Sequence, residues 1–222
     1  RSLSCNPART AASSRERGSE DNGCRSSGAC FSGARRDPGI DVAVLERRAH
    51  PVPEAAFKVG ESTVEIGAHY FANVLGLREH LDSEQIRKFG FRFFFSDGRS
   101  DIDRCTELGV SRILPTPSWQ IDRGRFENFL GEEARRLGVR FLHGATVRGI
   151  AMADGNDAHA ITFEHAGDTR TVHARWVVDA SGRAGLLKRK LDLSAPEVHD
   201  ANAVWWRVDG IIDPKLWSDD AD

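Results

Sequence analysis

Residues 40–46, Ile40-Asp41-Val42-Ala43-Val44-Leu45-Glu46, form a short apolar run that follows Pro38-Gly39 directly. An apolar run of this length, opened by turn residues, is typical of a buried parallel strand in an α/β protein. An acidic group at the carboxyl end of such a strand can accept both hydroxyl hydrogens of an adenosine ribose. Glu46 is therefore a candidate ribose-binding residue. The alternative is a surface glutamate that only ends the strand.

The segment that precedes this strand does not read as part of a folded domain. In residues 1–36, Leu3 and Phe31 are the only large apolar side chains, and glycines recur every five residues from 18 to 33. This spacing does not supply the GxGxxG turn between a strand and a helix that a dinucleotide-binding fold requires. Because so polar a segment cannot bury enough surface to offset its ordering entropy, we expect residues 1–36 to be disordered.

The composition of the 222 residues excludes several classes of protein. Lys and Arg number 31 against 33 Asp and Glu, so the chain lacks the positive excess of an electrostatic nucleic-acid binder. Its four cysteines form no CxxC pair, so we expect neither a metal site nor a disulfide framework. No apolar run approaches the roughly 18–20 residues of a membrane span. We expect a cytoplasmic protein with neither nucleic acid nor membrane as partner.

Hydrophobic spacing downstream of Glu46 predicts three helices. The first begins near Ser62 or Thr63, the second runs from about 82 to 88 and stops at Gly90, and the third begins after the cap Asp122 and closes at Gly138. Apolar runs predict strands at 91–95, 139–143, 145–150, 176–182 and 204–208, and an antiparallel hairpin of 160–165 with 169–174.

Two short motifs carry residues that could bind a ligand. Gly60-Glu61-Ser62-Thr63 heads the first predicted helix, whose free amides can bind an anion or a carbonyl oxygen; the alternative is a capping turn. Val178-Asp179-Ala180-Ser181-Gly182 ends a strand in small residues, where a backbone can come close to a ligand at the carboxyl edge of a sheet. The alternative is an ordinary exit from a strand into a loop.

Glu46, residues 58–63, residues 119–126 and residues 178–182 occur in an order that resembles the flavin-dependent halogenases of the tryptophan-halogenase family. That family belongs to a larger group of FAD-dependent enzymes, which includes monooxygenases and geranylgeranyl reductases. The resemblance covers about Asp37 to Trp217. It implies an α/β fold: a partial FAD-binding, Rossmann-like domain of the glutathione-reductase type, with a β-hairpin or meander and part of a substrate domain.

The resemblance also implies a division of the chain and a role for individual residues. Residues 37–62 and 109–190 would form the partial FAD-binding domain, and residues 63–108 and 191–222 the partial substrate domain. The residues implied to bind FAD are Glu46 at the ribose, Gly60 and Ser62 by the flavin ring, Arg123 on the FAD side of the sheet near Gln120, Val147 at the adenine and Asp179 at the diphosphate end.

Lys88, within Ile86-Arg87-Lys88-Phe89-Gly90, stands at about the place of the family's catalytic lysine. In that family the flavin hydroperoxide oxidises halide to hypohalous acid, and the lysine holds the electrophilic halogen beside an aromatic substrate. The resemblance therefore implies FADH2 from a separate flavin reductase, molecular oxygen, a halide and a small aromatic substrate. The alternative is that Lys88 is a cation at the end of a helix, where it favours the helix dipole and does nothing more.

The sequence departs from the family pattern at both ends. The glycine-rich diphosphate loop is missing, and the family's WxWxIP signature, its second FAD motif and its catalytic glutamate would follow residue 222. We hypothesise that residues 1–36 are a wrongly framed reading of the phosphate-loop region, and we expect this chain to bind FAD weakly or not at all. The alternative functions are an FAD-dependent monooxygenase, a geranylgeranyl-reductase-like enzyme, or an inactive truncated product.

Overall fold

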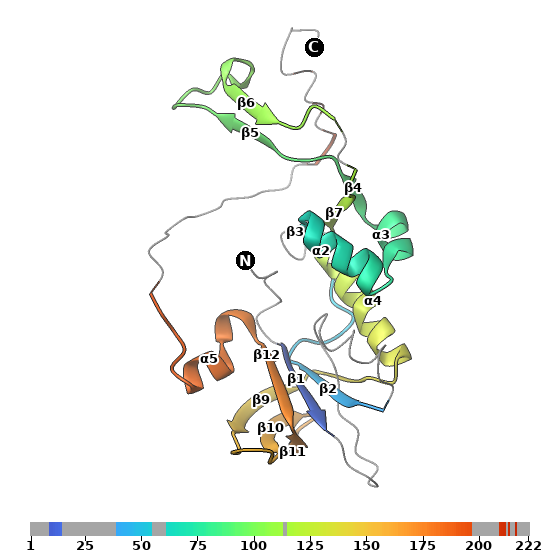
Figure 1. Ribbon diagram of the computed structural model, residues 1–222, viewed down its shortest axis with the longest axis vertical. Coiled ribbons are helices and arrows are strands. Elements are labelled where there is room, and N and C mark those ends of the chain that lie inside the picture. The colour runs from blue at the N-terminus through green and yellow to red at the C-terminus, as the bar shows by residue number, and fades with distance from the viewer. Residues whose placement is uncertain are drawn as a thin grey trace.

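The computed structural model describes residues 9–14, 39–54, 61–112, 115–196, 209–211, 213 and 216. A four-stranded sheet in the order β12-β1-β2-β8 lies in the lower part of Figure 1. Its strands are β1 (Arg9–Ser14), β2 (Asp41–Glu46), β8 (Arg140–His143) and β12 (Trp176–Ala180). β2 and β8 are parallel, so the expected buried parallel strand at 40–46 is confirmed. The partial Rossmann-like α/β fold is confirmed with it.

Strand β1 lies between β2 and β12 and is antiparallel to both. The expectation of disorder throughout residues 1–36 is therefore wrong for Arg9–Ser14, and the remainder of that segment lies outside the described residues. The physical reason is backbone pairing: six residues with little apolar content are held by ladder hydrogen bonds on both sides. Because β1 starts opposite Glu46, its carboxyl end lies at the opposite edge of the sheet from the carboxyl ends of β2 and β12.

A three-stranded antiparallel meander packs beside this sheet. It consists of β9 (Thr146–Ala151), β10 (His159–His165) and β11 (Asp168–Ala174), in the order β11-β10-β9. The turn between β10 and β11 places Ala166 and Gly167 at φ of 53° and 88°, which is the conformation that favours glycine in a tight hairpin. The predicted hairpin is confirmed, with the turn one residue earlier than expected.

The longest helix, α4 (Arg123–Arg136), connects the two halves of the molecule (Figure 1). It begins as predicted, because the side chain of Asp122 accepts a hydrogen bond from the backbone N–H of Arg125 at 3.0 Å. Its amino-terminal end also lies against the loop after β2: a Cβ at Gly124 would stand 2.1 Å from the carbonyl oxygen of Pro53. Glycine is therefore required at this close approach.

A second sheet, β3-β7-β4, lies against α4 and the shorter helices. Its strands are β3 (Glu61–Ser62), β7 (Ser118–Ile121) and β4 (Ile86–Lys88). The other helices are α2 (Glu65–His69), the π-helical turn η2 (Tyr70–Val74), α3 (Arg78–Glu84), the 3₁₀ turn η4 (Gly182–Ala184) and α5 (Leu186–Lys190). The first predicted helix is present, although it begins after Val64 rather than at Ser62.

The second predicted helix, from about 82 to 88, is wrong in its placement. Helix α3 begins at Arg78 and ends at Glu84, and Gln85 is already extended, with ψ of 157°. The side-chain carbonyl of Gln85 accepts the backbone N–H of Asp122 at 2.8 Å, and Ile86 then pairs with Gln120 on β7. Tertiary pairing with β7 therefore overrides the helical spacing of residues 86–88.

Strands β5 (Arg92–Phe95) and β6 (Thr106–Gly109), joined through the 3₁₀ turn η3 (Ile102–Arg104), form a separate two-stranded arm at the top of Figure 1. The expected strand near 91–95 is confirmed. Phe93 and Phe95 project from one side of β5 and keep 55% and 56% of their surface exposed. This arm contributes to neither of the two hydrophobic clusters in the described part of the chain.

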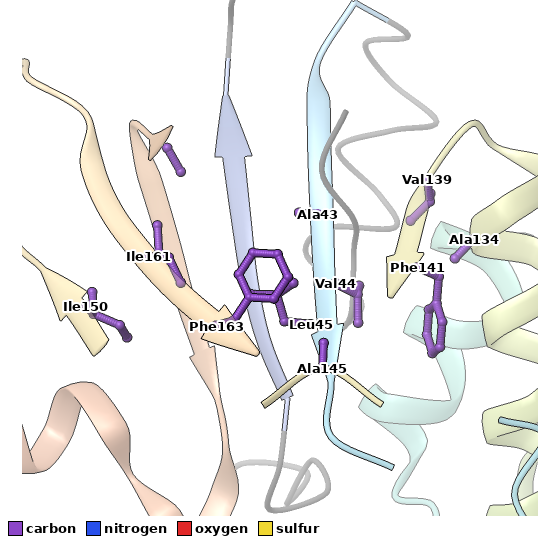
Figure 2. Packing of buried hydrophobic residues seen from close by; sticks show 11 residues of the cluster. Ala43, Val44, Leu45, Ala134, Val139, Phe141, Ala145, Ile150, Ile161 and Phe163 are labelled. Atoms are coloured by element: carbon purple, nitrogen blue, oxygen red, sulfur yellow. The ribbon is translucent and has the colours of Figure 1, made fainter. Parts of the chain in front are cut away.

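Those two clusters hold the body together. The first joins β2 and β8 with the meander, and Figure 2 shows Leu45 and Phe163 packed against each other at its centre. The second gathers α2, η2, α3 and β7 around Trp119, which is fully buried. Helix α4 supplies Ala134 to the first cluster and Phe126 to the second, so the two clusters share one helix.

Strand β12 is less buried than its apolar sequence predicts. Trp176 and Val178, on one face of the strand, are 74% and 38% exposed, whereas Val177 on the other face packs against the first hydrophobic cluster. The strand alternates because only one of its faces is covered. The predicted strand at 204–208 lies outside the described residues.

Candidate functional site

Glu46 is the last residue of β2 and is completely buried. Its carboxylate oxygen Oε1 accepts the backbone N–H of Arg48 at 3.0 Å, and its own carbonyl oxygen accepts the backbone N–H of Ala145. The alternative of a surface glutamate is therefore wrong. Its position, an acid at the carboxyl end of a parallel strand, is the one from which a carboxylate can bind ribose hydroxyl groups.

Asp179 shapes the turn that follows β12. Its Oδ1 accepts the backbone N–H of Ser181 at 2.9 Å, and its Oδ2 accepts the backbone N–H of Leu187 at 2.7 Å. The hydroxyl of Ser181 accepts the backbone N–H of Leu186 at 3.1 Å. Two side chains therefore tie the first residues of α5 to the end of the strand. Asp179 fixes the backbone of the small-residue turn, whose Gly182 and Gly185 have φ of 60° and 48°.

The register of the main sheet brings these two acids to one edge. Arg9 of β1 pairs with Glu46 on one side and with Ala180, the neighbour of Asp179, on the other. Glu46 and Ala180 therefore stand at the same level, two strand spacings or roughly 10 Å apart. The carboxyl edge of β2 and β12 is where open α/β sheets bind ligands.

Val147 lies on β9, opposite Phe163 of β10, and packs against the first hydrophobic cluster. A shallow cavity of about 220 Å³ opens beside it, lined by Gly144, Thr146, Glu164, His165, Ala166 and Gly167. None of the predicted site residues lines this cavity. Glu164 is held by the guanidinium of Arg148 at 2.6 Å, and this hydrogen bond lowers the pKa of the Glu164 carboxyl below its usual value.

Ser62 and Arg123 lie at the second sheet. Ser62 pairs with Gln120 across β3 and β7, and Arg123 opens α4 just after β7. The Arg123 guanidinium donates to Oε1 of Glu127 through Nη2 at 2.8 Å and through Nε at 3.2 Å. Both side chains are largely buried, at 12% and 5% exposed, so this pair fixes Arg123 against its own helix. Gly60 lies outside the described residues.

Lys88 ends β4, opposite Ser118 of β7. The alternative of a cation at a helix end is therefore wrong, since α3 ends at Glu84. Its Nζ donates to the carbonyl oxygen of Thr63 at 2.9 Å and lies 4.1 Å from the ring centroid of Phe91. The lysine is thus joined directly to the 60–63 motif.

The structure therefore gathers the predicted residues into two groups. Glu46 and Asp179 stand at one edge of the main sheet, with Val147 on the meander beside it. Ser62, Lys88 and Arg123 surround β7 in the second sheet. In Figure 1 the first group occupies the lower half and the second the upper half, with α4 running between them.

Sequence reasoning missed the role of Thr63 and Phe91. The first helix was expected to begin near Ser62 or Thr63; instead the Thr63 hydroxyl donates to the carbonyl oxygen of Trp119 at 2.8 Å, and α2 has no side-chain cap. Phe91 belongs to a run of phenylalanines at 89, 91, 93, 94 and 95. This run favours a strand, but nothing in it indicates that one ring covers Lys88.

No helix among the described residues is long and apolar enough to cross a membrane. In the same residues, no cluster of His, Cys, Asp and Glu side chains could hold a metal ion.

Comparison with known proteins places this geometry in context. The sequence pattern of the FAD binding domain family matches residues 26–218. A flavin-dependent halogenase of Dictyostelium discoideum, chlA, is 27% identical over 161 residues, which cover 64% of this chain and 26% of that protein. A 1H-pyrrole-2-carbonyl-[peptidyl-carrier protein] brominase of Pseudoalteromonas luteoviolacea is 28% identical over 155 residues, covering 70% and 35%. The chain thus spans about a quarter to a third of the length of these relatives.

Solved structures show the same fold. The flavin-dependent brominase Bmp2 superposes with a TM-score of 0.57 at 23% identity, over 76% of this chain and 39% of that one. The flavin-dependent halogenase CmlS superposes with a TM-score of 0.52 at 26% identity, over 66% and 26%.

Proposed function

This chain belongs to the FAD binding domain family, and from that premise we propose that it is part of a flavin-dependent halogenase that acts on a small aromatic substrate. The cofactor is FAD, as the sequence predicts. The observation that carries the proposal is the bond from Lys88 to the carbonyl of Thr63, which joins the candidate catalytic lysine to the segment that would lie beside the flavin.

The adenosine end of FAD fits the residues at the edge of the main sheet. Glu46 is a buried acid at the carboxyl end of β2, and the Asp179 turn presents small residues at the same edge. We assign Glu46 to the ribose, Val147 to the adenine and the turn that Asp179 fixes to the diphosphate end. Ser62, Gly60 and Arg123 are assigned to the flavin side.

The diphosphate itself has a poorer fit. The glycine-rich loop of a dinucleotide fold follows a parallel strand at the carboxyl edge of the sheet. Strand β1 runs the other way, so the chain that leaves it starts from the opposite edge. For this reason we expect the chain of 222 residues to bind FAD weakly or not at all. Flavin absorbance at about one equivalent after purification would contradict this expectation.

Bound in its reduced form, FAD supplies the electrons that activate oxygen, and a separate flavin reductase would supply the FADH2. The part of this chain is to place an ammonium group near that chemistry. Lys88 carries three N–H donors, and the carbonyl of Thr63 accepts one of them. A remaining donor can hydrogen-bond to the oxygen of a hypohalous acid and so hold its electrophilic halogen beside the ring of an aromatic substrate.

The test uses the protein encoded by the complete gene, with FADH2 from a separate reductase, oxygen, chloride or bromide, and a panel of phenols, indoles and pyrroles. We expect a halogenated product that requires both halide and oxygen. A hydroxylated product that forms without halide would instead identify a monooxygenase. Reduction of a prenyl double bond would identify a geranylgeranyl-reductase-like enzyme.

The sequence makes three further predictions that belong to the same proposal. Residues 37–62 with 109–190, and 63–108 with 191–222, are assigned to the FAD-binding and substrate parts respectively. Resequencing the coding DNA tests the origin of residues 1–36: an uninterrupted frame, with no GxGxxG in either alternative frame, would defeat the hypothesis of a wrongly framed segment. A cytoplasmic location also stays a prediction.

A further inference from the structure

We propose that Phe91 and Thr63 are positioning residues, which together hold the Lys88 ammonium at one fixed point beside the β3-β7-β4 sheet. The Thr63 carbonyl oxygen lies 2.9 Å from Nζ, and the centroid of the Phe91 ring lies 4.1 Å from it. A lysine side chain has a flexible four-carbon stem, so an unrestrained ammonium would sample a wide volume. The inference rests on the proposed function, which gives Lys88 a reason to be held.

The carbonyl that accepts from Lys88 is itself rigid. Thr63 is 1% exposed, and its backbone N–H donates to the carbonyl oxygen of Trp119 at 2.9 Å. Its hydroxyl bonds to both backbone groups of Trp119, donating to the carbonyl oxygen and accepting from the N–H, each at 2.8 Å. Trp119 is fully buried, and its indole N–H donates to Asp82 of α3 at 3.2 Å. Lys88 is therefore anchored to a point that the second hydrophobic cluster fixes.

The ring that covers Lys88 is placed by the turn between β4 and β5. A Cβ at Gly90 would stand 2.3 Å from Cγ2 of Val110, so a larger residue here would force the Val110 side chain, in the segment after β6, to move. The next residue, Phe91, comes back over Lys88 and lies 5.7 Å from the ring of Phe93. An ammonium over the face of an aromatic ring is attracted by the ring quadrupole.

The Thr63 carbonyl and the Phe91 ring contribute differently to the position of the Lys88 ammonium. The carbonyl accepts one N–H and fixes the distance of Nζ from the 60–63 motif, whereas the ring holds the charge without consuming a donor. The carbonyl and the ring face together leave at least one of the three N–H groups of Lys88 for a ligand. A residue that offered a carboxylate in place of Phe91 would occupy those donors, and the ring does not.

The experiment measures this geometry without any enzymatic activity. The lysines of the 222-residue chain are labelled by reductive methylation with ¹³C, and the Lys88 signal is assigned by its loss in Lys88→Arg. Methyl groups above an aromatic ring are shifted upfield, so we expect the Lys88 signal to be displaced from the other lysine signals. We expect Phe91→Leu to abolish the displacement and Phe91→Tyr to retain it.

Phe95→Leu is the matched control, because Phe95 lies on β5 close to Phe91 in sequence and is similarly exposed, at 56% against 49% for Phe91. It should leave the displacement in place. An undisplaced Lys88 signal in the folded wild-type chain, or equal displacement in wild type and Phe91→Leu, would overturn the proposal. A nuclear Overhauser contact between the Lys88 methyl groups and the Phe91 ring gives the same answer without a variant.

This outcome is separate from that of the proposed function. The displacement can behave as expected while Lys88→Ala still halogenates in the complete protein. In that case Phe91 and Thr63 do position Lys88, but the catalytic role assigned to Lys88 is wrong. If Lys88→Ala abolishes halogenation but the signal does not depend on Phe91, the role of Lys88 stands and Phe91 is not its positioning residue.

Discussion

The edge of the main sheet differs from the end of β4, together with the β5–β6 arm that follows it, in how functional groups are held. At the sheet edge, Glu46 and Asp179 are bound to backbone amides only two to eight residues away, next to a closed hydrophobic cluster. At the end of β4, Lys88 is held by Thr63, 25 residues before it, and the phenylalanines of the arm that follows stay about half exposed. The sheet edge is thus stabilised locally and by burial, whereas the end of β4 depends on a few long-range contacts.

The largest expected difference is in packing. Leu45→Ala should lower the free energy of unfolding by about 2–5 kcal/mol, because Leu45 is 1% exposed at the centre of the first cluster. Phe93→Ala on the arm should change it by no more than about 0.5 kcal/mol, because its ring is already largely in solvent. Urea unfolding of both variants measures the contrast. Similar losses in the two would show that the arm is packed as tightly as the sheet.

The next effect concerns the turn after β12. Asp179→Ala should cost about 1–3 kcal/mol, since the backbone N–H groups of Ser181 and Leu187 both lose their acceptor. Asp179→Asn is the matched control and should cost less, because an amide oxygen can still accept one of these bonds. Unfolding by urea, followed by circular dichroism, distinguishes the two variants. Equal losses would mean that charge, rather than the hydrogen-bond acceptor, stabilises the turn.

A smaller effect is the pH dependence of the free energy of unfolding. It comes from His80, at the contact between α3 and α4. Burial lowers the pKa of His80, which stacks on Phe129 with ring centroids 3.7 Å apart. The folded state therefore binds its proton less readily than the unfolded state, so stability should decline as the pH falls below about 6.5. Glu84 opposes this shift and Arg125 adds to it.

Urea unfolding at a series of pH values measures this dependence. His80→Leu should flatten the decline below about pH 6.5, and His173→Gln, a change at an exposed position of β11, should not. An unchanged decline in His80→Leu would assign the pH dependence to other groups.

The smallest expected effect is at the surface of α4. Arg125 bonds to Glu84 at 2.9 Å, with both side chains nearly half exposed. Exposed ion pairs of this kind contribute about 0–1 kcal/mol, so Arg125→Ala should shift the urea midpoint only slightly. Arg125→Lys keeps the charge and should match the wild type. A loss larger than that of Asp179→Ala would contradict this ranking.

The same contrast explains what could be predicted from the sequence. Three features are determined by residues close together in the sequence, and all three are confirmed. They are the strand that ends at Glu46, the cap at Asp122 and the hairpin around Gly167. The pairing of β4 with β7 could not be predicted from neighbouring residues, because Ile86 and Gln120, which pair, are 34 residues apart. The spacing of apolar residues favoured a helix through residue 88, but pairing with β7 makes residues 86–88 a strand.

The candidate site divides along the same line. The sequence supplied candidate residues for it, but it did not predict that both carboxylate oxygens of Asp179 would accept hydrogen bonds from the turn that follows β12. Strand β1 was missed for a related reason: Arg9–Ser14 carries little apolar signal and is held by backbone bonds to both neighbours.

The most direct test of the proposed function is the yield of halogenated product per FADH2 oxidised, measured in the complete protein for wild type, Lys88→Ala and the exposed control Lys188→Ala. We predict that Lys88→Ala continues to oxidise FADH2 but gives no halogenated product, while Lys188→Ala matches the wild type. Halogenation by Lys88→Ala at the wild-type yield would contradict the role assigned to this lysine.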